Sequence, residues 1–176
     1  MQKEKVLQMY KIGSIVVYGT EGLCKICDIT ERTFGKETSE YYVLSPLANE
    51  AETVFVPKNN EKVLKRMRPI LSKERASELL EAAPSEYGEW VENDRERQQI
   101  YKQILLCGSS EDLLMMTRAL YLHQIELLER GKKLHAADER FLKDAEKMLF
   151  EELAYVYNIT VAEVLPLITR KKETGR

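Results

Sequence analysis

The spacing of apolar residues changes near residue 70, and this change constrains the fold most. Before it, apolar and aromatic residues form short runs separated by glycine, proline and polar residues. After it, apolar residues recur at intervals of three and four over longer stretches, as on one face of an α-helix. The order predicts an α+β fold with a β-rich domain over residues 1–70 and an all-α domain over residues 71–170. Residues 171–176 are predicted to form a disordered tail.

The β-rich domain is predicted to be a small antiparallel barrel. Its strands are expected at residues 15–18, 23–30, 40–44 and 53–56, with a possible fifth at 63–68. Closely spaced short strands joined by glycine and proline turns are typical of compact barrels.

The second domain is predicted to contain about five helices. Ser72 is expected to cap the first, and the stretch 83–88 to end it. The second helix is expected at residues 93–106, with a stop at Gly108. The third is expected to run from a cap at Ser109 or Ser110 to residue 131. The last two are expected at residues 134–157 and 161–168, and Thr160 is expected to cap the final one.

The composition indicates a soluble globular protein. The chain has 176 residues, of which 44% are hydrophobic and 32% charged. No apolar run approaches the length of a membrane helix, and no signal-peptide pattern follows Met1, so a cytoplasmic protein without membrane contact is expected. The net charge is −2, from +2 in residues 1–70 and −4 in residues 71–176. Any DNA contact is therefore expected to be weak unless a partner already holds the DNA.

The sequence contains no pattern that indicates an enzyme. Phosphate-binding loops, dinucleotide-binding glycine patterns and zinc-protease motifs are missing, and the two histidines, His123 and His135, have no nucleophile or acidic partner placed beside them. The acidic pair Glu151-Glu152 is interpreted as a solvated helix face. We therefore expect no catalytic residue, no metal site, no cofactor and no small-molecule substrate.

Cys24 and Cys27 form a C-x-x-C pair within a predicted strand. Strand positions three apart point to opposite faces, which favours two structural cysteines over a shared site. A thiol-redox or metal-binding function for this pair remains as an alternative hypothesis.

Trp90 is the only tryptophan and lies in a polar stretch between two predicted helices. Such a residue is either a packing anchor or an exposed contact residue, and the sequence alone favours the anchor. Arg95, Arg97 and Lys102 follow on the next helix, interleaved with acidic residues in the manner of an ordinary salt-bridged surface.

A resemblance to a known family covers about residues 9 to 155. The ordered motifs are similar to those of the CarD/CdnL family of bacterial RNA-polymerase-binding regulators, whose N-terminal domain is shared with the transcription-repair coupling factor. The residues that carry the resemblance are Lys11-Ile12-Gly13, Val16-Val17-Tyr18, Gly22, Glu31-Arg32-Thr33, Glu40-Tyr41-Tyr42-Val43-Leu44, Val56-Pro57 and the segment 134–154.

The resemblance implies a Tudor-like domain that docks on the polymerase β subunit and a helical domain that contacts promoter DNA at the upstream edge of the bubble. It implies that Arg32 contacts polymerase, and Phe55 replaces a second polymerase-facing arginine of some members. It makes Trp90 the candidate for a wedge in the minor groove, with Arg95, Arg97 and Lys102 as candidate phosphate contacts. In well-known members basic residues follow the tryptophan closely, whereas residues 91–94 intervene here.

The sequence thus predicts a non-enzymatic transcription regulator that docks on polymerase and stabilises the promoter open complex. The alternatives are a polymerase-binding protein without DNA contact and the thiol or metal protein described above.

Overall fold

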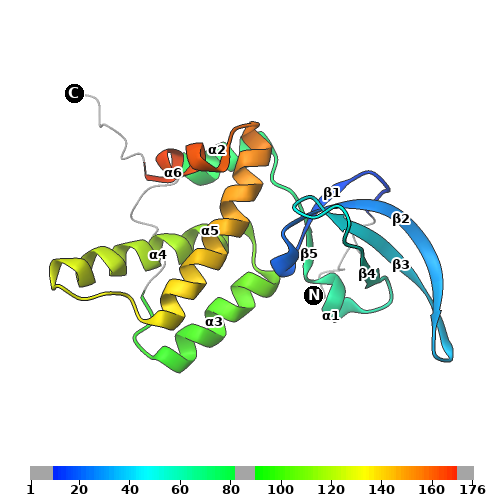
Figure 1. Cartoon of the computed structure of the whole chain (residues 1–176), viewed down its shortest axis with the longest axis horizontal. Coiled ribbons are helices and arrows are strands. Elements are labelled where there is room, and N and C mark those ends of the chain that lie inside the picture. Colours follow the sequence, from blue (N-terminus) through cyan, green and yellow to red (C-terminus); the bar gives the residue numbers. More distant parts are fainter. Residues whose placement is uncertain (1–9, 82–89, 170–176) are drawn as a thin grey trace, which may run out of the picture.

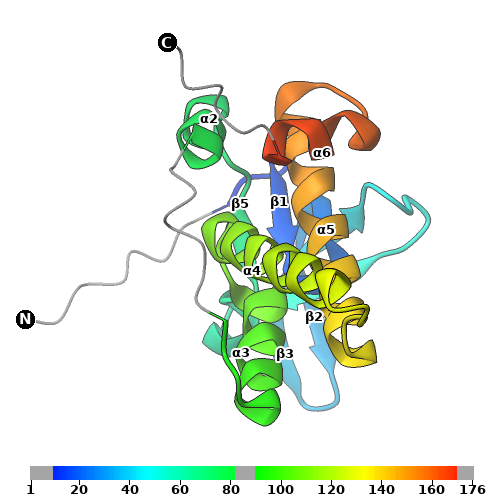
Figure 2. The same cartoon turned by 90° about the vertical axis from the view of Figure 1, so that its left-hand side faces the viewer.

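A computed structural model describes residues 10–81 and 90–169 of the chain. A β-sheet part and a helical part lie side by side along the long axis of the molecule (Figure 1). Seen from the helical side, the helices stand in front of the sheet (Figure 2).

The sheet has five antiparallel strands in the order β4-β3-β2-β1-β5. A 3-10 turn, η1 (Gly19–Glu21), joins β1 to β2, and the short helix α1 (Glu61–Leu64) precedes β5. The strands are β1 (Ile15–Tyr18), β2 (Leu23–Phe34), β3 (Glu37–Pro46), β4 (Val54–Pro57) and β5 (Met67–Pro69).

The strand predictions are correct in order and differ in length. Strands β2 and β3 are longer than expected because they pair continuously to the tip of one hairpin, where Phe34 faces Glu37. The expected strand at 63–68 is wrong in its first half, since the Asn60 side chain accepts hydrogen bonds from the backbone of Lys62 and Val63 and caps α1 there. Strands β4 and β5 are the two ends of the sheet order, so the sheet is open and the closed barrel is not confirmed.

The sheet encloses a small core on its inner face. Apolar side chains of β1, β2, β3 and β4 alternate inward, and α1 covers them from below. The fully buried members are Val16, Cys24, Ile26, Leu44 and Val56, with Tyr18, Tyr42 and Met67 beside them.

Five helices follow the sheet in the described part of the chain: α2 (Lys73–Glu81), α3 (Asp94–Cys107), α4 (Ser110–Glu129), α5 (Ala136–Tyr157) and α6 (Val161–Thr169). The predicted caps are confirmed at Ser72, whose hydroxyl accepts from the backbone of Arg75, and at Ser109, which forms a capping box with Asp112. The predicted break at 83–88 and the tail at 171–176 lie outside the described residues.

The helices pack around α5, whose inner face is mainly apolar and includes the buried acids Asp138 and Glu152. The centre of this core consists of Ala76, Leu113, Leu114, Leu120, Ala145, Leu149, Leu153 and Val164. None of the helices within residues 10–81 and 90–169 is both long and apolar enough to span a membrane.

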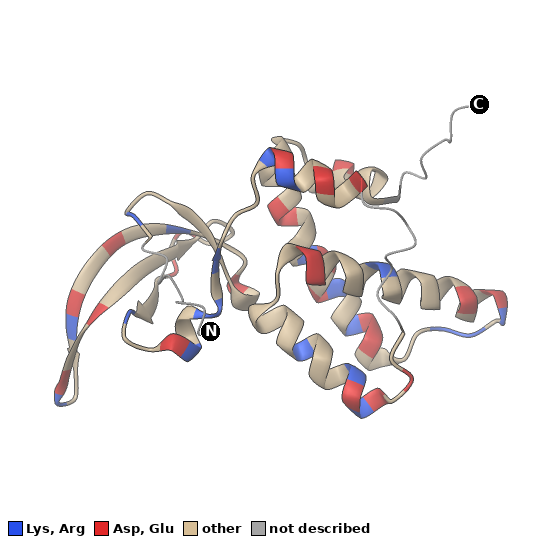
Figure 3. Ribbon diagram, turned by 180° about the vertical axis from the view of Figure 1, so that it is seen from behind, with Lys and Arg blue, Asp and Glu red and all other residues tan. Residues whose placement is uncertain are grey.

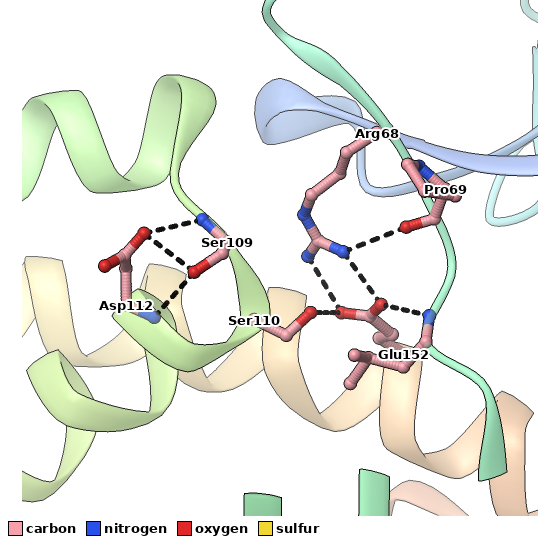
Figure 4. Close-up of polar contacts among 7 residues, drawn as sticks. Arg68, Pro69, Ser109, Ser110, Asp112 and Glu152 are labelled. Carbon is pink, nitrogen blue, oxygen red and sulfur yellow. Dashed lines mark hydrogen bonds and ion pairs between the residues drawn. The ribbon is translucent and has the colours of Figure 1, made fainter. Parts of the chain in front are cut away.

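One buried ion pair joins the sheet to the helices (Figure 4). The Arg68 guanidinium on β5 donates two hydrogen bonds of 2.8 Å to the Glu152 carboxylate on α5. The same carboxylate accepts from the Ser110 hydroxyl at 2.7 Å and from the Leu71 backbone N–H at 3.1 Å. Glu152 is 0% exposed, so its interpretation as part of a solvated helix face is wrong. Glu151, the preceding residue on α5, is only partly buried, so the two adjacent acids have different surroundings.

Candidate docking face

A β-bulge in β2 decides which of its side chains face outward. Cys24 and Ile26 are both buried on the inner face of the sheet. The pairing of β2 with β3 then shifts between Ile26 and Asp28, which makes Cys27 the extra residue of the bulge. Beyond it the alternation resumes in the opposite phase, so Ile29 packs against the core and the even-numbered residues that follow face outward.

The strand register carries this outward face across three strands. Residues paired directly across antiparallel strands point to the same side, and β3 pairs Tyr41 with Thr30 and Val43 with Phe55. Thr30 shares its side with every second residue toward the hairpin tip. The resulting surface, which we name the docking face, consists of Arg32, Phe34, Tyr41, Val43 and Phe55.

The aromatic rings of the docking face contact one another in a row. The centroids of Phe34 and Tyr41 lie 5.4 Å apart and those of Tyr41 and Phe55 6.5 Å apart, both edge to face. Arg32 places its guanidinium carbon 4.4 Å from the centre of the Phe55 ring, a cation–π contact. At an exposed site such a contact contributes about 0.5–1 kcal/mol.

The docking face is accessible and suited to an acidic partner. Phe34 is 57% exposed at the end of the hairpin, which projects away from the helices (Figure 1). Arg32 is exposed, and no acidic residue within the described ranges forms an ion pair with it. A guanidinium held flat on a ring keeps its N–H groups free to bind a carboxylate in a bidentate manner.

The family model of the CarD-like/TRCF RID domain matches residues 10–71. These residues are similar to that domain over their whole length, and we call them the RID domain of this chain. Domains of this family interact with the β subunit of RNA polymerase, and the RID domain of this chain contains all five strands and the whole docking face. Helices α2 to α6 begin after the matched residues. A comparison with curated proteins found no match.

The structure brings Arg32 and Phe55 of the RID domain into contact, although they are 23 positions apart. Sequence reasoning missed Phe34 and Tyr41 as further members of the docking face. A signal for Tyr41 exists, because the run 40–44 has an apolar or aromatic residue at four consecutive positions and therefore leaves such residues on both faces of a strand. Phe34 lies outside the strands that the sequence predicts, because the length of the hairpin follows only from the pairing of β2 with β3.

Trp90 lies against the helical core, and its ring contacts the side chains of His123 and Arg97. Its ring stacks on His123 of α4 with centroids 3.7 Å apart and planes 16° apart. The Arg97 guanidinium lies 4.3 Å from the Trp90 ring centre. The ring is half-buried and packs against the helical core, which is the position of a packing anchor.

Arg97 is buried, and its guanidinium is committed to internal partners. The side chain donates to both carboxylate oxygens of Asp138 at 3.0 and 2.8 Å, to Asp94 at 2.7 Å and to the Val91 carbonyl at 2.7 Å. The hydrogen bonding of the Arg97 guanidinium to the Asp138 carboxylate raises the pKa of Arg97 and outweighs the effect of its desolvation. With 3% of its surface exposed and its guanidinium bound to Asp138 and Asp94, Arg97 is not accessible to a phosphate in this conformation.

Arg95 and Lys102 are exposed on α3, seven positions apart and therefore on one face of the helix. Acidic and basic residues are interspersed along the helical part (Figure 3). Arg95 and Lys102 are therefore accessible in this conformation, and Arg97 is not.

Cys24 and Cys27 lie on opposite faces of β2. Burial, together with the nearby Glu21 and Glu52, raises the pKa of the Cys24 thiol to about 12, which is the reverse of a reactive thiol. Cys27 is exposed at the bulge. No group of three metal-ligating side chains occurs in the part of the chain that the structure describes.

Proposed function

We propose that this protein is a non-enzymatic bacterial transcription regulator whose RID domain docks on the β subunit of RNA polymerase in the cytoplasm. The observation that carries the proposal is the docking face on a domain of this family, where the exposed Arg32 rests on Phe55. In this arrangement Phe55 supplies no second positive charge, and its ring instead supports the guanidinium of Arg32. An exposed aromatic patch with one cation suits an acidic surface that carries apolar side chains.

The experiment is a titration of purified RNA polymerase with the full-length protein and its Arg32→Glu variant. A repulsive charge at an interface weakens binding by about 2 kcal/mol or more, so the affinity of Arg32→Glu is expected to fall about 30-fold. Arg140→Glu, an exposed arginine on α5, is the matched control and is expected to bind like the wild type. Equal affinity of a folded Arg32→Glu variant would overturn docking through this face.

Phe55→Ala tests how the docking face works. It removes the ring beneath Arg32 and the edge contact to Tyr41, and a loss of about tenfold in polymerase affinity is expected from these two contacts together. Unchanged affinity would mean that Arg32 acts alone.

For the helical part we propose the stabilisation of the promoter open complex through Trp90, Arg95 and Lys102. Two exposed cations on one face of α3 are suited to adjacent phosphates, and polymerase supplies the high local concentration that a weak contact requires. In this arrangement the Trp90 ring must leave His123 before it can enter the minor groove.

A second candidate is a regulator that docks on polymerase without touching DNA. The clamped position of Trp90 and the internal ion pairs of Arg97 favour it. The two candidates share the docking face and differ only in the helical part.

Open-complex half-life at matched polymerase occupancy distinguishes these candidates. Direct DNA contact predicts a shorter half-life for Trp90→Ala and for the double variant Arg95→Glu, Lys102→Glu, whose residues are exposed and whose fold should be intact. If the double variant and wild-type protein give equal half-lives, the docking-only candidate holds.

A further inference from the structure

An open groove runs between the two parts of the molecule on a side that the docking face does not include. Its volume is about 680 Å³. The RID domain contributes Leu23, Leu47 and Ala48, and the end of α5 with the start of α6 contributes Ala154, Tyr155, Ile159 and Val161. Tyr155 is 50% exposed and Val161 47% exposed, so the apolar wall faces solvent. Exposed apolar side chains gathered around a groove are a mark of an interaction site.

One carboxylate accompanies this apolar wall. Glu151 lines the groove, and its Oε2 lies 3.2 Å from the position that a Cβ would take at Gly22 in the turn before β2. Glu151 forms no ion pair with a lysine or arginine among the described residues. The groove is therefore apolar with one uncompensated negative charge in its lining.

The groove is built across two parts that the Arg68–Glu152 pair holds together. Glu152 and Glu151 are adjacent on α5, so the buried acid fixes the helix against β5 while its neighbour presents a carboxylate to the groove. This connection keeps the two walls at a constant separation, which favours a preformed site.

We propose that this groove binds an amphipathic helix of a partner protein, one that carries arginine or lysine beside its apolar face. Charge complementarity favours a cation beside the apolar face, because the Glu151 carboxylate lines the apolar wall without a cationic partner among the described residues. A helix suits the wall because the exposed apolar side chains continue from Tyr155 past Val161 to Leu165, one turn further along α6. Successive side chains of one helical face would follow this strip. The proposal goes beyond polymerase docking and does not depend on it.

The test is fluorescence anisotropy with the full-length protein and two labelled helical peptides of about 15 residues. Both peptides carry leucines at the i, i+3, i+4 and i+7 positions, and they differ in having arginines or glutamates beside that stripe. Tyr155→Ala removes part of the apolar wall, Glu151→Gln removes one charge, and Glu74→Gln, an exposed acid on α2, is the matched control.

The arginine peptide is expected to bind the wild type at least tenfold more tightly than the glutamate peptide. Tyr155→Ala should weaken the arginine peptide about tenfold, Glu151→Gln about threefold, and Glu74→Gln should leave its affinity unchanged. Equal affinities of the two peptides, or an arginine-peptide affinity that Tyr155→Ala does not change, would overturn the proposal.

Two further outcomes would assign the groove to another occupant and so also overturn it. If deletion of residues 170–176 raises the peptide affinity tenfold or more, the basic tail of the chain itself competes for the groove. If the protein self-associates in sedimentation experiments and Tyr155→Ala abolishes this, the occupant is a second copy of the chain.

Discussion

At the scale of single residues, the stacking of Trp90 on His123 favours a packing role for Trp90 over that of an exposed contact residue. Their rings stack at 3.7 Å, and Arg97 approaches the same indole while it pairs with Asp138. Trp90 thereby ties the chain before α3 to α4. An aromatic pair of this kind contributes about 0.5–1.5 kcal/mol beyond its buried area.

His123→Ala should lower the free energy of unfolding by about 1 kcal/mol, because it removes the stacking partner of Trp90. The same variant should shift the emission of the protein's single tryptophan to longer wavelength as the ring gains contact with water. Urea denaturation followed by fluorescence measures both effects. His135→Ala, an exposed histidine before α5, is the control, and equal results for the two variants would contradict the stack.

Cys24 should make stability fall at alkaline pH. Its pKa is raised by burial to about 12 in the folded state, so the folded protein keeps the proton where the unfolded chain releases it. The resulting stabilisation is complete below pH about 9 and is lost as pH rises toward 12. A Cys24→Val variant should lose less stability than the wild type between pH 8 and 10.5 in urea denaturation, and parallel losses in the two proteins would count against this assignment.

At the scale of elements, one inserted residue sets the outward face of the long hairpin. The bulge at Cys27 reverses the alternation of β2, and a regular strand that kept Cys27 without a bulge would point Arg32 toward the inner face. The docking face therefore depends on an irregularity in the pairing and not on the residues of the face alone.

Deletion of Cys27 should leave Arg32 facing outward and preserve polymerase binding, because Asp28 then follows Ile26 directly and the pairing with Leu44 and Val43 continues without a bulge. Cys27→Ser keeps the bulge and should change the free energy of unfolding by no more than about 0.5 kcal/mol, as for an exposed substitution. The measurements are urea denaturation and the polymerase titration. Loss of Arg32-dependent binding in a folded deletion variant would show that Cys27 is not the extra residue of the bulge.

At the scale of the whole molecule, the buried Arg68–Glu152 pair couples the RID domain to the helices. Glu152 satisfies three groups from separate segments, namely the Arg68 guanidinium, the Ser110 hydroxyl and the Leu71 N–H. Removing one member of a buried pair leaves the other charge unpaired and costs about 3–5 kcal/mol.

Glu152→Gln should therefore lower the free energy of unfolding by about 3 kcal/mol and increase the radius of gyration in solution scattering as the two parts separate. Glu151→Gln changes the adjacent acid in the groove and should alter neither quantity. If both substitutions behave alike, the pair does not hold the two parts together.

The sequence by itself determined the order and type of the elements. Short apolar runs with glycine and proline turns specify strands, and spacing by three and four with serine caps specifies helices, because both signals are local. For this reason β1, the hairpin and the caps at Ser72 and Ser109 were predictable, and so was the match of the first part to a known domain.

Only the tertiary structure decided which of these residues are exposed and what they touch. The register shift at Cys27 reverses the phase of β2, and no local pattern announces a bulge. The adjacent acids Glu151 and Glu152 have the same residue type, yet one lines a groove and the other is buried by a partner 84 positions away. Arg97 was likewise indistinguishable from Arg95 until Asp138 was brought beside it, since long-range pairing depends on how the helices pack.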